Sequence, residues 1–210
     1  AAALQKNHTD ATIYEEKVEL FLSKCEEGKE GYPSKGDVEH LQSSPPCKGF
    51  SRANTTGDQS KRRKNNLLSM QTIRGTHILR PETGMIENVT GLLDPRHVHY
   101  AISILQGLTD LDYQVRIAIH NSCHFGVAQK RQRVIITFSR KDISLPAMPT
   151  PTHHEGCFVT LRDAIEDLEH VPCDITGSGL VRLSNDRFTF NHVASQQRKS
   201  SQTLPYDEPV

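Results

Sequence analysis

The chain has 210 residues, 25 basic and 25 acidic side chains, and a mean hydropathy of −0.54. This length suffices for one domain with its own core or slightly more, and no apolar run approaches the roughly 18 residues that a membrane-spanning helix needs. Because the net charge is zero, the overall charge does not indicate nucleic-acid binding, and only local clusters of basic residues can do so.

In chain order, the hydrophobic pattern predicts strands and helices that largely alternate. Strands are expected over 11–14, 37–41, 83–89, 113–119 and 133–138, and helices from about Val18 onward and over 65–79, 97–108 and 160–168. The last helix has Thr160 as its expected N-cap and Asp163 in its first turn. Such alternation predicts an α/β fold with a largely parallel sheet.

The composition changes after Leu145, where the segment PAMPTPTHHEG forms a proline-rich connector. Residues 172–210 are polar and only weakly periodic. His153, His154 and Cys157 are residue types that bind metals, but without a second ligand pair an ordinary loop is the favoured interpretation. No C-x-x-C pair occurs among the cysteines, which lie at positions 25, 47, 123, 157 and 173. Since residues 1–22 contain no signal-peptide core, reduced thiols inside a cell are expected.

One cysteine lies in an unusually restricted segment, SSPPCKGFS at residues 43–51. Pro45 and Pro46 restrict the backbone that leads into Cys47, and Gly49 permits a turn after it. An ordinary loop that contains a cysteine is the alternative interpretation. A phosphatase loop is excluded, because the C-x5-R motif would need its arginine one position after Arg52.

Polar residues mark two further turns of the expected sheet, Glu87-Asn88 at the end of one strand and residues 129–133 (QKRQR) where another begins. Ligands of open α/β sheets bind outside the carboxyl ends of the strands, so Cys47 and Glu87 are expected at one rim. A carboxylate that ends an apolar strand needs a partner, which an arginine of QKRQR would supply. A Glu–Arg pair that merely braces two strands is the alternative.

Three segments in this order, PPCKGFS at 45–51, ENV at 87–89 and GVAQKRQRVII at 126–136, resemble the cytosine-5 DNA methyltransferases. The flanks AAALQKNHTDATIYEE and KGDVEHLQSSPPC are similar to the eukaryotic maintenance-type enzymes. The segments ENVTGLLDPRH, LPAMPTPTH and VTLRDAIEDL are more similar to the fungal branch, and the resemblance covers nearly all of residues 1–171.

The resemblance implies a Rossmann-like methyltransferase fold that uses S-adenosyl-L-methionine. Residues 1–150 would form part of the catalytic domain, 151–203 a connector with a target-recognition region, and 204–210 the start of the return to the core. The Phe-x-Gly-x-Gly motif, which the family has upstream of the segments quoted above, does not occur in this sequence. The sequence is therefore expected to be a fragment of the catalytic domain.

By the same resemblance, the thiolate of Cys47 attacks C6 of a cytosine flipped out of the duplex, and C5 then takes the methyl group. A free cysteine has a pKa of about 8.5, so its surroundings must favour the thiolate. A protonated Glu87 would neutralise the charge at N3 of the base. Arg133, with Arg131 as the alternative, would hold Glu87 and the O2 atom of the base.

Further contacts are implied in the same way. Expected cofactor contacts are Glu16 and Pro45, and expected DNA contacts are Ser51, Asn88, Gln129, Lys61, Arg62 and Arg63. The expected partners are double-stranded DNA and, through regions outside this sequence, chromatin-associated proteins in the nucleus, with no membrane and no metal. Lys48 departs from the glutamine that the family usually has after Pro-Cys.

Two other functions compete with DNA methylation. A methyltransferase-like module that binds DNA or a partner without chemistry is supported by Lys48, whereas Cys47 and Glu87 argue against it. A tRNA cytosine-5 methyltransferase of the same fold is the other, and Gln129 argues against that function because such enzymes usually lack the glutamine.

Overall fold

The computed structural model describes residues 2–46, 50 and 68–166, together with three short strands at 174–175, 180–182 and 189–191. Cys47, Lys48, Ser51 and the basic run 61–64 lie outside the described residues. The chain divides into two compact units, the first formed by residues 1–120 and 132–149 and the second by 121–131 and 150–210.

The first unit contains a four-stranded sheet in the order β1-β2-β4-β3. Its strands are β1 (His40–Ser43), β2 (Thr83–Val89), β3 (Tyr113–Asn121) and β4 (Gln132–Arg140). β1 runs parallel to β2, with Ser43 opposite Ile86, but β2 runs antiparallel to β4, with Val89 opposite Arg133. The prediction of a largely parallel sheet is therefore confirmed for β1 and β2 and wrong for β4. A parallel crossover needs a dozen or more residues and usually a helix, and the short connection 122–131 between β3 and β4 provides neither.

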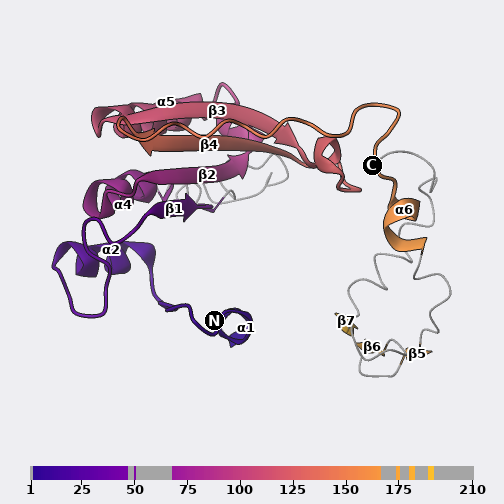
Figure 1. The fold of residues 1–210 in the computed structure, drawn as a ribbon, viewed down its shortest axis with the longest axis horizontal. Coiled ribbons are helices and arrows are strands. Elements are labelled where there is room, and N and C mark those ends of the chain that lie inside the picture. The colour runs from indigo at the N-terminus through magenta and orange to yellow at the C-terminus, as the bar shows by residue number, and fades with distance from the viewer. Residues whose placement is uncertain are drawn as a thin grey trace. The chain divides into compact units, whose positions relative to one another are not determined.

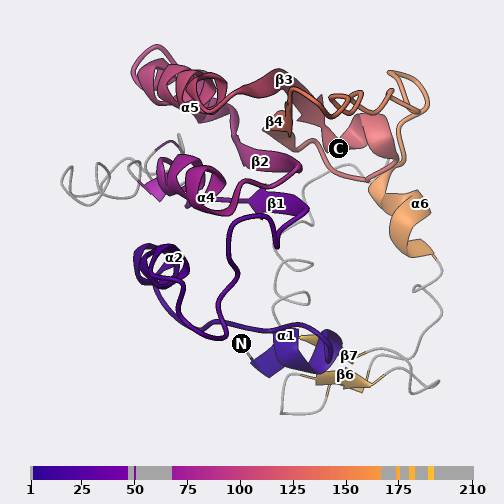
Figure 2. The same ribbon diagram turned by 60° about the vertical axis from the view of Figure 1, so that its left-hand side comes forward.

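Three helices, α2 (Val18–Glu26), α4 (Gln71–Leu79) and α5 (Val98–Asp110), lie in a row on one face of this sheet (Figures 1 and 2). α2 packs on α4 and α4 packs on α5. The core between sheet and helices consists of Ile86, Ile104, Leu108, Tyr113, Val134, Ile136 and Phe138. The alternating burial of β2 and β4 sends every second side chain into this core, which leaves the residues between them for the other face.

Shorter elements complete the described structure. They are α1 (Ala2–Asn7), η1 (Thr90–Leu93), η2 (Ser122–Phe125), α6 (Leu161–Ile165) and a three-stranded sheet of β5 (Asp174–Ile175), β6 (Leu180–Arg182) and β7 (Thr189–Asn191). Thr160 caps α6 in a capping box with Asp163, which confirms the predicted helix start. None of the helices among the described residues is long and apolar enough to cross a bilayer.

Two predicted strands differ from the structure. Residues 11–14 form no strand, because they pair with none of the strands of the described sheet. The strand expected over 37–41 forms instead over His40–Ser43, which brings the strand closer to the Pro-Pro segment. The helix expected over 65–79 is described from residue 68 onward and has its regular part at Gln71–Leu79.

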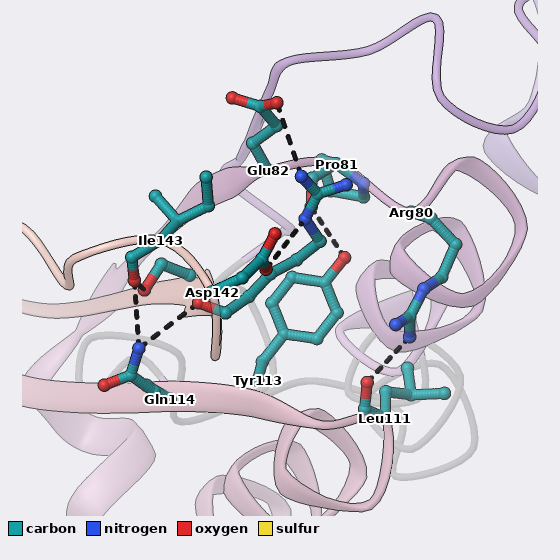
Figure 3. A network of polar contacts seen from close by, with 10 residues as sticks. Arg80, Pro81, Glu82, Leu111, Tyr113, Gln114, Asp142 and Ile143 are labelled. Carbon is teal, nitrogen blue, oxygen red and sulfur yellow. Dashed lines mark hydrogen bonds and ion pairs between the residues drawn. The ribbon is translucent and has the colours of Figure 1, made fainter.

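A polar network fixes the end of the sheet at which β2 begins (Figure 3). The hydroxyl of Tyr113 donates to the carbonyl of Pro81 at 2.6 Å, and Arg80 donates to the carbonyl of Leu111 at 2.7 Å. The amide of Gln114 donates to the carbonyls of Arg140, the last residue of β4, and of Ile143 after it. Each of these side chains donates to a backbone carbonyl, so this rim is stabilised by hydrogen bonds between side chains and the backbone.

Candidate active site

The opposite rim is where β1 leads into the Pro-Pro segment. Ser43, the last residue of β1, pairs with Ile86, the residue before Glu87. The hydroxyls of Ser43 and Thr72 are hydrogen-bonded at 2.7 Å, which ties the end of β1 to the first turn of α4. Pro45 and Pro46 therefore leave the sheet beside the end of β2 that carries Glu87, and the next residue in the sequence is Cys47.

Glu87 and Arg133 form an ion pair at this rim. The Nε atom of Arg133 lies 2.7 Å from Oε1 of Glu87, and the side chains are 22% and 31% exposed. In the antiparallel register, Glu87 faces Ile135 and Val89 faces Arg133, so the charged pair is a diagonal pair on one face of the sheet. Nη1 of Arg133 also donates to the carbonyl of Gln132 at 2.7 Å, which fixes the orientation of the guanidinium group.

The antiparallel direction of β4 is what brings these two residues together. Because β4 begins where β2 ends, the first residues of β4 lie at the same rim as the last residues of β2. Of the two arginines expected as partners of Glu87, Arg133 holds it. The carboxylate is thus paired with one guanidinium and remains partly accessible at this rim.

Asn88 follows Glu87 in β2, lies on the buried face of the strand and is only 2% exposed. Its Oδ1 accepts a hydrogen bond from the backbone N–H of Val89 at 2.9 Å. Its Nδ2 is buried and has no hydrogen-bond partner in the described structure. A buried donor without an acceptor is costly, so a role for Asn88 in holding an adjoining backbone or ligand is consistent with its position.

A cavity of about 580 Å³ opens beside the Pro-Pro segment. Its walls come from the start of α2, the end of β1 and the first turns of α4, and they include Val18, Phe21, Leu41, Pro45, Pro46 and Leu68. This volume and this largely apolar wall are typical of a site for a small molecule or cofactor. Pro45 lines this cavity, and its contact with a cofactor stays a prediction. Val18 and Leu68 were missed, because in the sequence they belong to helical stripes that predict only core packing.

Glu16 precedes this cavity in the chain, but the described wall begins with Lys17. The carboxylate of Glu16 forms an ion pair with Lys24 and accepts a hydrogen bond of 2.9 Å from the hydroxyl of Tyr32. The bond from Lys24 is the main reason why the pKa of Glu16 is lowered, with Tyr32 adding to it. Glu16 thus holds the turn before α2, and its contact with a cofactor stays a prediction.

Gln129 and Arg131 belong to the second unit, and both side chains are exposed. The backbone N–H of Arg131 donates to Oδ1 of Asn121 at 3.0 Å, and its carbonyl accepts from the N–H of Ser122 at 3.0 Å. These bonds close the loop between β3 and β4 and leave both long polar side chains to solvent.

The connector that follows the sheet packs on the same loop within the second unit. The backbone N–H groups of Thr152 and His153 both donate to the carbonyl of His124. His154 and Cys157 contact each other, with 3.1 Å between Nδ1 and Sγ. Within the described ranges, no three His, Cys, Asp or Glu side chains converge on a metal position.

The model of the family of C-5 cytosine-specific DNA methylases matches residues 1–205. The chain belongs to this family. DNA (cytosine-5)-methyltransferase 1 of Mus musculus is 27% identical over 220 residues, which cover 100% of this chain and 14% of the mouse protein. The type II methyltransferase M.BsuRI of Bacillus subtilis is 37% identical over 128 residues, 59% of this chain and 29% of that protein.

The fold is also that of a methyltransferase. A prophage-encoded E. coli protein of known structure, assigned as a DNA modification methyltransferase, matches with a TM-score of 0.53 and 22% identity. The match covers 82% of this chain and 47% of that protein. The expected α/β methyltransferase fold is therefore confirmed, although the present chain spans less than half of each of these proteins.

Proposed function

We propose that this chain supplies the catalytic centre of a DNA cytosine-5 methyltransferase. The observation that carries the proposal is the 2.7 Å ion pair between Glu87 and Arg133 beside the exit of the Pro-Pro segment. Membership of the cytosine-5 methylase family supports the same chemistry. Cys47, the residue after Pro46, is the proposed nucleophile.

In the proposed reaction, the thiolate of Cys47 forms a bond to C6 of a cytosine turned out of the duplex. The electron pair displaced from the C5–C6 double bond makes C5 nucleophilic, and C5 takes the methyl group. Glu87 donates a hydrogen bond or a proton to N3 and so compensates the negative charge that builds on the ring. Arg133 holds the side chain of Glu87 in place through its 2.7 Å contact. Loss of the C5 proton and departure of the thiolate from C6 then restore the aromatic ring.

The residues around the cavity fit the adenosyl part of S-adenosyl-L-methionine. Val18, Leu68 and Pro45 offer apolar surfaces to a purine, and the volume is adequate for it. When bound, this cofactor would supply the electrophilic methyl group. The cavity lies directly beside the Pro-Pro segment, so a cofactor held there would lie near the residue that follows Pro46.

Double-stranded DNA is the proposed substrate. The exposed Gln129 and Arg131, with Ser51 and the basic run 61–64, would bind the backbone and position the target base. The buried Asn88, also an expected DNA contact, would instead orient the adjoining segment. Residues 151–203 are proposed to contribute to target recognition, and 204–210 to return toward the core. A nuclear location and chromatin-associated partners are part of the same proposal.

The proposal is tested by trapping the covalent intermediate. The complete gene product is incubated with S-adenosyl-L-methionine and a duplex that contains 5-fluorocytosine, whose fluorine cannot leave as the C5 proton does. We expect an adduct that survives denaturation in the wild type and is absent in Cys47→Ser. Cys157→Ser is the matched control for the loss of a thiol, because Cys157 is an exposed free cysteine with no part in the proposed covalent step, and it should form the adduct normally.

The competing functions predict other results. A protein that binds both DNA and cofactor but forms no adduct would be a binding module without chemistry. In that case Lys48→Gln is the first variant to examine for recovered activity. An adduct with a tRNA substrate and none with duplex DNA would indicate an RNA methyltransferase.

A further inference from the structure

Phe50 is a buried anchor three positions after the proposed nucleophile. It is only 2% exposed, and its ring packs against Leu92 and Ala101. The rings of His97 and Tyr100 each lie 5.5 Å from it in edge-on arrangements. The segment that begins at Pro45 is therefore held at its far end by a side chain inserted between η1 and the start of α5.

The backbone of Phe50 makes an equally close contact with Gly91 in η1. A Cβ atom added to Gly91 would lie 2.0 Å from the carbonyl oxygen of Phe50 and 3.0 Å from its carbonyl carbon. Both atoms belong to the backbone, so no change of rotamer relieves the clash. Gly91 does not have a positive φ angle, so the position requires glycine for space and not for conformational freedom.

This contact lies on the stretch of chain that also carries Glu87. Only Asn88, Val89 and Thr90 separate Glu87 from Gly91, and only residues 47–49 separate Pro46 from Phe50. A displacement of Phe50 therefore reaches Cys47 through only two intervening residues of the chain, Lys48 and Gly49. The described anchors on the two sides are the bond between Ser43 and Thr72 and the contact of Phe50 with Gly91, with six residues between Ser43 and Phe50.

We propose that Gly91 is a positioning residue for the methylation reaction: by admitting the Phe50 carbonyl against its Cα, it sets the placement of Cys47 relative to Glu87. This inference rests on the proposed function, since it assigns to Gly91 a role only if Cys47 is the nucleophile. A methyl group at position 91 must push the Phe50 backbone away. The displaced end of a three-residue connection would then carry the thiol out of line with its target.

The test is Gly91→Ala in the complete gene product, with the rate of adduct formation on 5-fluorocytosine DNA measured in a single turnover. Misplacement of a reacting group by 1 Å can cost about 100-fold in rate, so we expect the rate to fall by about 10- to 100-fold. The dissociation constants for cofactor and DNA should stay within about threefold, because the cavity residues are unchanged. A purely structural role for Gly91 would instead weaken binding and folding together with the rate.

Gly107→Ala is the matched control. A Cβ at Gly107 would lie 2.9 Å from Cγ2 of Ile73, so this variant also introduces crowding, but against a side chain and in the part of α5 that follows the residues in contact with Phe50. We expect this variant to form the adduct at the wild-type rate. A folded Gly91→Ala protein that also reacts at the wild-type rate would overturn the positioning role.

The outcomes separate the two proposals. If the wild type forms no adduct, the proposed function fails, whatever Gly91 does. If Gly91→Ala does not fold, Phe50→Leu tests the inference instead. This substitution leaves the backbone carbonyl of residue 50 in place and only reduces the size of the buried side chain. A folded Phe50→Leu protein should react several-fold more slowly with unchanged binding constants, and a wild-type rate there would overturn the inference.

Discussion

Replacing Arg133 by glutamine tests whether its ion pair with Glu87 serves chemistry. The substitution removes the charge that lies 2.7 Å from the Glu87 carboxylate, and a glutamine side chain retains a hydrogen-bond donor of shorter reach. Charge-assisted hydrogen bonds contribute about 1.5–3 kcal/mol, and partial exposure of both side chains places this pair toward the lower end, at about 1–2 kcal/mol. If that energy orients Glu87 in the transition state, the rate of adduct formation should fall by about 5- to 30-fold.

The assay is single-turnover adduct formation on 5-fluorocytosine DNA with saturating cofactor, together with denaturant unfolding of each variant. Arg140→Gln is the matched control, because Arg140 lies at the other end of β4 and pairs with Glu82 at 3.4 Å and Asp142 at 3.3 Å. This variant should lose a little stability and keep the wild-type rate. It therefore measures what the loss of an arginine from the same strand costs by itself.

If the ion pair between Glu87 and Arg133 only stabilises two neighbouring strands, a different result is expected. In that case Arg133→Gln lowers the free energy of unfolding by the same 1–2 kcal/mol, and folded protein forms the adduct at the wild-type rate. That outcome would refute the assignment of Arg133 to the reaction. A double-mutant cycle with Glu87→Gln measures the coupling directly, since the two substitutions should not add if they remove the same interaction.

Three other expectations concern stability and DNA binding. Burial raises the pKa of Tyr113 above its ordinary value, so its stabilisation is complete below about pH 10 and is lost as the pH rises toward the folded-state pKa. Tyr113→Phe should abolish this alkaline loss in pH-dependent unfolding and cost about 1 kcal/mol through the bond to Pro81. Leu108→Ala, at a fully buried position of α5, should lower the free energy of unfolding in denaturant titrations by about 2–5 kcal/mol. Arg131→Gln should reduce the slope of log affinity against log salt by about one if Arg131 contacts a phosphate, and an unchanged slope would contradict that contact.

Local patterns were sufficient for most of the helices and strands. The apolar periodicity of 97–108 predicted α5 to within two residues, and 83–89 coincides with β2, because each pattern reflects which side of one element faces the core. Thr160 with Asp163 predicted a helix start from capping chemistry alone. The strand predicted over 11–14 does not form, because a strand needs a neighbouring strand to pair with, and a local pattern does not show whether one is there.

The sequence by itself determined the chemistry that is available: a cysteine after two prolines, a carboxylate at the end of a strand and arginines at the start of another. Tertiary structure decided how these residues meet. The antiparallel direction of β4 placed Arg133 beside Glu87, and the contact between Phe50 and Gly91 arose between segments far apart in the chain. Residue types and local periodicity are properties of neighbouring positions, whereas strand direction and close backbone approach depend on how distant segments share one core, and only the folded chain contains that information.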